Sequence, residues 1–129
     1  MTKEELLNSN FTEDQLDEIQ LGIKDGVDVS LYAKENLLAI QMRQIRLGLL
    51  SGVMVSKYND PKFDWFQMEE IRIGLENHID VDKYCSPEIP YMKMRQIRKA
   101  LMLGIDLTSQ LDKNADVLRQ IRKAVVAGI

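Results

Sequence analysis

Residues 41–58 read QMRQIRLGLLSGVMVSKY, and this stretch decides the fold because close copies of it lie 26 residues away on either side. The copies are QLDEIQLGIKDGVDVSLY at 15–32 and QMEEIRIGLENHIDVDKY at 67–84, then KMRQIRKALMLGIDLTSQ at 93–110 and the shortened VLRQIRKAVVAGI at 117–129. A fixed period of this length is typical of arrays in which each unit packs on its neighbours. We therefore expect an all-α chain that forms an α-solenoid of about five repeats, each a long helix, a tight glycine turn and a short helix.

The repeat makes residues 1–129 a single helical-repeat domain. We expect a half repeat at 1–10, in which Leu6 takes the place of the repeat tyrosine. Full repeats then cover 11–36, 37–62, 63–88 and 89–114, and a truncated repeat covers 115–129.

Short local signals predict where each long helix begins and ends. Thr12 and Gln15 have the spacing of a capping box, in which each side chain bonds the backbone of the other residue. Asp64 and Gln67 repeat this device at the third copy. Glycine suits the left-handed residue that closes a helix, and it recurs at the matching position as Gly26, Gly52, Gly104 and Gly128.

Two further features concern packing. Gly22, Gly48 and Gly74 lie inside the long helices, where glycine costs about 1 kcal/mol relative to alanine, so we expect the repeat tyrosine or the adjacent helix to pack closely there. Ile40 with Leu47, and Phe66 with Ile73, form a second apolar face, which predicts that the middle helices bury two faces.

The composition of the chain favours a soluble protein with a buried core over a membrane or secreted protein. A chain with 45% hydrophobic and 29% charged residues can bury a core, and charged residues interrupt every apolar run before the roughly 18 residues that a membrane span needs. The start of the chain lacks the basic and apolar regions of a secretory signal, and the single Cys85 can form no internal disulfide. We expect a soluble, cytoplasmic protein with no membrane partner.

No pattern in the sequence predicts catalysis, a cofactor or a metal site. His78, the only histidine, takes the position of the helix-ending glycines. We interpret Cys85 as a small side chain that packs beside the repeat tyrosine. The aspartates of the turns lack the spacing of a calcium loop and are explained by capping. We therefore expect a protein that is not an enzyme.

Arginine recurs at a pair of helix positions three residues apart. Stacked repeats would align these side chains into a stripe that either binds the phosphates of nucleic acid or forms ion pairs between neighbouring repeats. Two glutamates, Glu69 and Glu70, interrupt the stripe. The members of this arginine stripe are Arg43, Arg46, Arg72, Arg95, Arg98, Arg119 and Arg122.

Aromatic side chains and overall charge suggest partners. Trp65, Phe66, Tyr91 and Met92 cluster at the starts of two helices, and Trp65 or Tyr91 would anchor a protein partner if the fold leaves them exposed. Residues 1–35 carry 3 basic and 9 acidic side chains, whereas residues 90–129 carry 8 basic and 3 acidic ones. This asymmetry could favour head-to-tail self-association into a homo-oligomer.

The pattern QMxxIRxGLxxGxDVSxY, best kept at 67–84 and 41–58, resembles tandem helical repeats of uncharacterised bacterial proteins that are often linked with mobile elements. The resemblance covers nearly the whole chain and implies a stacked helical fold, but no activity and no site residues. We therefore expect a non-catalytic protein-interaction module or scaffold with an unknown protein partner. The alternatives are nucleic-acid or polyanion binding through the arginine stripe, and a structural self-assembling unit.

Overall fold

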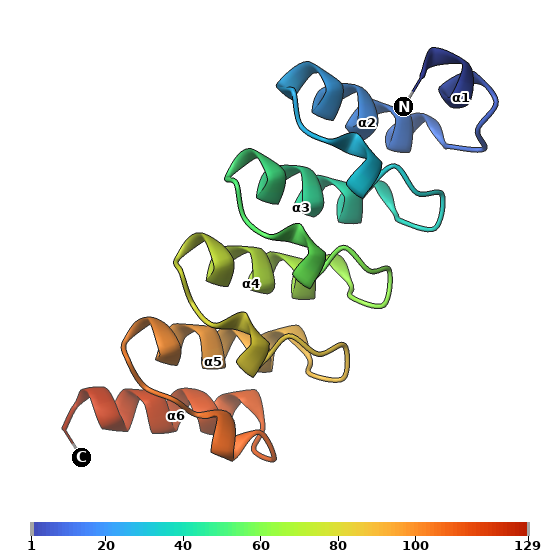
Figure 1. The fold of residues 1–129 in the computed structure, drawn as a ribbon. Coiled ribbons are helices and arrows are strands. Elements are labelled where there is room, and N and C mark those ends of the chain that lie inside the picture. Colours follow the sequence, from blue (N-terminus) through green and yellow to red (C-terminus); the bar gives the residue numbers. More distant parts are fainter. Residues whose placement is uncertain (1, 129) are drawn as a thin grey trace.

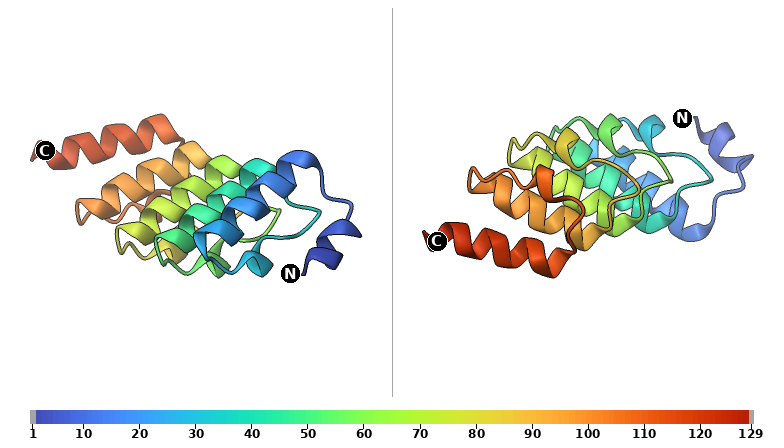
Figure 2. Two further views of the ribbon diagram at one scale, coloured as in Figure 1. Left: turned by 90° about the horizontal axis from the view of Figure 1, so that it is seen from above. Right: turned by 90° about the horizontal axis from the view of Figure 1, so that it is seen from below.

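The computed structural model describes residues 2–128, and all of its regular elements in that range are helical. The long helices α2 to α6 pack consecutively, each against the next, and form a row in chain order (Figure 1). The short helix α1 lies at the end of the row where α2 stands, as the two views of Figure 2 also show. The α-helices are α1 (Lys3–Leu7), α2 (Glu13–Asp25), α3 (Ala39–Leu50), α4 (Trp65–Glu76), α5 (Tyr91–Met102) and α6 (Ala115–Val126), and the 3-10 turns are η1 (Val29–Leu31), η2 (Val55–Lys57), η3 (Val81–Lys83) and η4 (Thr108–Gln110).

The predicted helix starts are confirmed. The Thr12 hydroxyl accepts the Gln15 N–H at 3.2 Å, and the Gln15 side chain accepts the Thr12 N–H at 2.8 Å. Asp64 and Gln67 form the same pair of bonds at the start of α4. Because these bonds satisfy backbone donors that the first turn of a helix leaves open, they fix the residue at which each helix begins.

The predicted helix ends are also confirmed. Four glycines at the same position of their repeats have φ between 76° and 81°, in the left-handed region. His78 takes this position after α4 with φ 58°, so its place in the fold is that of a helix-ending residue. The glycines are Gly26, Gly52, Gly104 and Gly128.

The core runs through the row of helices. Ile19, Ile45, Ile71 and Ile97, which lie 26 residues apart, are each fully buried. Met42, Met68 and Met94, one turn before the last three of these isoleucines, are buried with them, and Leu118 is buried at the same position of the last repeat. Equivalent residues of successive repeats therefore share one continuous apolar core.

Each repeat tyrosine locks its 3-10 turn onto the preceding long helix. The Tyr58 hydroxyl donates to the Gln44 carbonyl at 2.6 Å, and a Cβ on Gly48 would lie 2.1 Å from that hydroxyl oxygen. This confirms the prediction that the helix glycines admit the tyrosine ring. Burial raises the pKa of the tyrosine hydroxyls, in Tyr32 to about 12. The other two locks pair Tyr32 with Gly22 and Tyr84 with Gly74.

The repeat glutamine connects each long helix to the next connecting segment, a role that the sequence did not predict. The side-chain nitrogen of Gln41 donates to the Phe63 carbonyl at 2.7 Å, while its oxygen caps the Leu38 N–H at 2.8 Å. Gln15 and Gln67 make equivalent bonds. Where the fourth copy has Lys93, the ammonium donates to the Leu111 carbonyl at 2.7 Å.

The prediction that the middle helices bury a second apolar face is wrong. Ile40 is 41% exposed and Phe66 is 38% exposed, while Leu47 and Ile73 are half-buried. The described residues pack against the opposite, tyrosine-bearing face and leave this outer face open to solvent. None of the helices in residues 2–128 is long and apolar enough to cross a bilayer.

Candidate functional site: the helix joints and the aromatic strip

The arginine stripe lies at the joints between consecutive long helices. At the joint of α2 with α3, the buried carboxylate of Glu18 accepts Arg43 Nε at 2.9 Å and Arg46 Nε at 3.0 Å. Arg46 also reaches Asp25 at 3.1 Å. Burial lowers the pKa of Arg46, but its hydrogen bonds and charge interactions with Glu18 and Asp25 outweigh this effect and raise it.

The joint of α4 with α5 repeats this arrangement two repeats later. The Glu70 side chain is 1% exposed, and its two oxygens accept Arg95 Nε and Arg98 Nε, both at 2.7 Å. The hydrogen bond that Arg95 donates to Glu70 raises the pKa of Arg95. A buried carboxylate whose two oxygens are each bonded to a guanidinium is well compensated for the loss of water.

The two remaining joints carry glutamine in place of glutamate. At the joint of α3 with α4, the Gln44 side-chain oxygen accepts Arg72 Nε at 3.0 Å, and Arg72 also pairs with Glu76 of its own helix at 2.9 Å. At the joint of α5 with α6, the Gln96 oxygen accepts Arg122 Nη2 at 3.2 Å. A joint with glutamate therefore binds two guanidinium groups, and a joint with glutamine binds one.

The exposure of the stripe differs between its two positions. The side chains of Arg46, Arg72 and Arg98 are between 10% and 16% exposed, because each one reaches back across a joint. Arg43 and Arg119 are roughly half exposed, and Arg119 pairs with Asp116 of its own helix at 3.3 Å. Some side chains of the arginine stripe are therefore buried at the joints, and others are exposed to solvent.

Both predicted aromatic anchors, Trp65 and Tyr91, are half-buried and lie in a larger cluster with exposed apolar residues, which we call the aromatic strip. The Trp65 and Phe66 ring centroids are 3.7 Å apart, and the Phe66 and Tyr91 centroids are 4.6 Å apart, both in stacked geometry. The Arg95 guanidinium carbon lies 5.6 Å from the Tyr91 ring centre. The aromatic strip consists of Leu38, Ile40, Trp65, Phe66, Tyr91 and Met92 at the starts of α3, α4 and α5.

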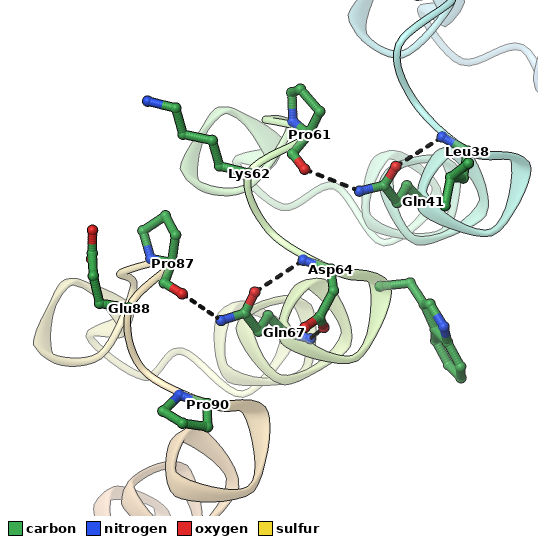
Figure 3. A pocket seen from close by; sticks show the side chains of 10 residues that line it. Leu38, Gln41, Pro61, Lys62, Asp64, Gln67, Pro87, Glu88 and Pro90 are labelled. Carbon is green, nitrogen blue, oxygen red and sulfur yellow. Dashed lines mark hydrogen bonds between the residues drawn. The ribbon is translucent and has the colours of Figure 1, made fainter.

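A groove of about 440 Å³ adjoins the aromatic strip and shares Leu38 and Trp65 with it. Figure 3 shows that Gln41 and Gln67 bond the backbone along the groove, where they bind the carbonyls of Pro61 and Pro87. These bonds occupy polar backbone groups of the groove wall. Besides Leu38, Trp65 and the two glutamines, its lining comprises Pro61, Lys62, Asp64, Pro87, Glu88 and Pro90.

The cysteine and the turn aspartates, which are residue types that can react or bind metals, form hydrogen bonds within the fold. The Cys85 thiol, half-buried, donates to the Lys57 carbonyl at 2.9 Å, and burial raises its pKa. Asp28 and Asp80 cap the 3-10 turns through the N–H groups of Ser30 and Asp82. Within residues 2–128, no three metal-ligating side chains gather in a group that could hold an ion.

Sequence reasoning placed Phe66 beside Trp65 and Tyr91 in one cluster, but it expected Ile40 and Phe66 to be buried, whereas the structure exposes both. The repeat pattern shows which residues of each helix are apolar. It does not show which face of the row of helices is covered by other segments of the chain. Comparison with known protein families, with curated proteins and with solved structures finds no significant match for this chain.

Proposed function

We propose that the chain is an α-solenoid of five 26-residue repeats that acts as a non-catalytic protein-interaction scaffold. Its partner site is the aromatic strip together with the adjoining groove. The observation that carries the proposal is the exposed apolar register on three successive helices, where Ile40, Phe66 and Met92 are 41%, 38% and 51% exposed. An apolar surface shared by three elements is typical of a binding site.

The composition of the strip suits a protein partner. Trp65 and Tyr91 flank Phe66 in one stack, so the rings present a preformed apolar surface that loses little side-chain freedom on binding. Packed helices lie about 8–10 Å apart, and seven residues of a helix span about 10 Å. A partner helix laid across α3, α4 and α5 would therefore place apolar side chains seven residues apart over successive members of the strip.

The arginine contacts support a structural part in the same scaffold. Arg46, Arg72 and Arg98 each donate from Nε to a side chain of the preceding helix, and little of each side chain is exposed. Phosphate binding would need these groups to exchange their present partners. We propose that these three hold the joints, and nothing in their contacts favours the nucleic-acid alternative.

Peptide display on the purified chain tests the proposal. Peptides selected for binding should carry apolar residues at helical spacing, and they should shift the fluorescence of Trp65, the only tryptophan. The triple substitution Ile40→Ser, Phe66→Ser and Met92→Ser should weaken their binding by about a hundredfold, since each lost apolar contact is worth about 1 kcal/mol.

A matched control places serine at three exposed apolar residues outside the strip, namely Leu50, Met54 and Met102. This control should bind the selected peptides as the wild type does. Circular dichroism and urea unfolding establish that both triple variants fold. Peptides that bind the strip variant and the control equally well would place the partner site elsewhere on the molecule.

A further inference from the structure

Among residues 2–128, the buried arginines at the other three joints each pair with a carboxylate, whereas Arg122 at the joint between α5 and α6 does not. Arg46 and Arg98 bind the buried glutamates of the preceding helices, and Arg72 binds Glu76. Arg122 reaches only the amide oxygen of Gln96, and its Nε is buried with no hydrogen-bond partner within residues 2–128. Among the described residues, the guanidinium of Arg122 therefore has no counter-ion.

A cavity of about 330 Å³ opens beside this uncompensated group. It is lined by Arg98, Lys99, Met102, Leu103 and Arg122. Lys99 is exposed and forms no ion pair with the described part of the chain, while Met102 and Leu103 offer apolar surface. A cavity that is cationic on one side and apolar on the other fits a carboxylate carried next to an apolar side chain.

The opposite end of the row offers the complementary surface. In Figure 1 helices α1 and α2 lie at one end of the row and α6 at the other. On α2 the exposed side chains include Leu21 and Ile23, and Leu21 borders a hollow that is also lined by Asp17, Gln20 and Lys24. Five exposed carboxylates of α1 and α2 take part in no ion pair among residues 2–128, namely Glu4, Glu5, Glu13, Asp14 and Asp17.

We propose that the cavity between α5 and α6 binds the acidic α1–α2 end of a second copy of this chain. Carboxylates of α2, with Asp14 and Asp17 foremost, would compensate Lys99 and Arg122, and Leu21 would cover the apolar side of the cavity. The contact joins different surfaces of the two copies, so it is heterologous and can add copies in a line. It uses neither the aromatic strip nor its groove and is independent of the function proposed above.

Sedimentation velocity over a range of concentrations tests the proposal. The wild type should associate at about 0.02 M salt and dissociate at about 0.5 M, because exposed charges are screened at high ionic strength. The cavity variant Lys99→Glu and the end variant Asp14→Asn with Asp17→Asn should each associate at least about tenfold more weakly. Lys83→Glu reverses an exposed charge on η3, in the middle of the row and outside both the groove and the cavity, and serves as the matched control.

Mixing the two variants makes the test specific. The cavity variant keeps a native acidic end and the end variant keeps a native cavity, so an equimolar mixture should form dimers that cannot grow further. A wild type that stays monomeric at low salt would overturn the proposal, as would a mixture that remains monomeric. A monomeric wild type that binds heparin or a polyglutamate peptide through Lys99 would assign the cavity to another polyanion and equally overturn it.

Discussion

One atom in each repeat decides how closely the 3-10 turn approaches the long helix. The hydroxyl of Tyr32 lies where a Cβ on Gly22 would be, 1.8 Å away, and it donates to the Glu18 carbonyl at 2.7 Å. The fourth repeat departs from this rule in a consistent way, because Ala100 replaces the glycine where Gln110 replaces the tyrosine. The glycine and the tyrosine are therefore one feature of the fold and are lost together.

Gly48→Ala tests this pairing. Alanine favours an isolated helix by about 1 kcal/mol, but here its methyl group would displace the buried Tyr58 hydroxyl and Val55, at a cost of about 1–3 kcal/mol in packing and about 1 kcal/mol in hydrogen bonding. We expect a net destabilisation of about 2 kcal/mol in urea unfolding. The double variant Gly48→Ala with Tyr58→Phe should recover part of this loss. A single variant more stable than the wild type would show that the close approach does not require glycine.

The buried tyrosines also predict a loss of stability in alkali. Burial raises the pKa of Tyr32 from 10.0 to about 12 and that of Tyr58 above its usual value, so the folded state keeps phenolic protons that the unfolded chain releases. This contribution is fully present below about pH 10 and is lost as the pH rises through the folded-state pKa. Each tyrosine should lower the free energy of unfolding by up to about 1.4 kcal/mol per pH unit in that range.

Urea midpoints measured from pH 9 upward, together with the ultraviolet absorbance of the phenolate, check this expectation. Tyr58→Phe should show a shallower decline, because it removes one of the three shifted groups. A wild type whose midpoint stays level while its tyrosines ionise would contradict the account of their burial.

At the scale of helices, the bonds between arginine and glutamate or glutamine recur at each joint between consecutive long helices. Glu18 and Glu70 alternate with Gln44 and Gln96, and each glutamate binds two arginines of the next helix whereas each glutamine binds one. Between the two glutamate joints Glu69 stands where Arg43 and Arg95 stand in their helices. In α3, α4 and α5 the arginines at these positions thus match the glutamate or glutamine of the helix before, whereas α6 places Arg119 and Arg122 after Gln96.

Replacing Glu70 tests the joint of α4 with α5. Glu70→Ala leaves Arg98, which is 10% exposed, without its counter-ion and should destabilise the fold by about 3–4 kcal/mol. Glu70→Gln recreates the natural arrangement of Gln44 with Arg72 and should cost only about 1–2 kcal/mol. Glu69→Gln, which alters the neighbouring and more exposed carboxylate, should change stability by less than about 0.5 kcal/mol. Equal losses for the alanine and glutamine variants would argue against a role for the amide as an acceptor.

The end of α4 offers a stabilising change. His78 has φ 58°, a left-handed conformation that costs an L-residue about 1–2 kcal/mol and that glycine adopts freely at the same position of other repeats. His78→Gly should therefore raise the free energy of unfolding by about 1 kcal/mol in thermal or urea unfolding. Asn77→Gly, one residue earlier at φ −101°, should bring no such gain. A less stable glycine variant at 78 would show that the imidazole makes a stabilising contact.

For the whole molecule, the period and the helix limits could be predicted from sequence because their causes are local. A capping side chain acts within three residues, and a closing glycine acts on its own backbone, as Thr12 and Gly26 show. The close contact of tyrosine with glycine spans only ten residues in one repeat. Such signals lie within a single copy and are repeated, so the sequence reports them several times.

The surface could not be predicted in the same way. Periodicity shows that Ile40 and Phe66 form an apolar face but not whether another layer covers it, and the structure leaves it open. The partners of Arg46 and Arg98 lie 28 residues earlier in the chain, an offset that arises from the spacing of packed helices. Both features depend on how one repeat is placed against the next.

The central claim is that consecutive repeats pack with equivalent residues in equivalent places along the row. Methyl–methyl nuclear Overhauser spectroscopy on a chain labelled at Ile, Leu and Met tests it most directly. The account predicts a ladder of contacts that links the core methyl groups of α2 to α3, α3 to α4, α4 to α5 and α5 to α6. Strong contacts between α2 and α5, or solvent-exposed methyl groups at Ile19, Ile45, Ile71 and Ile97, would contradict it.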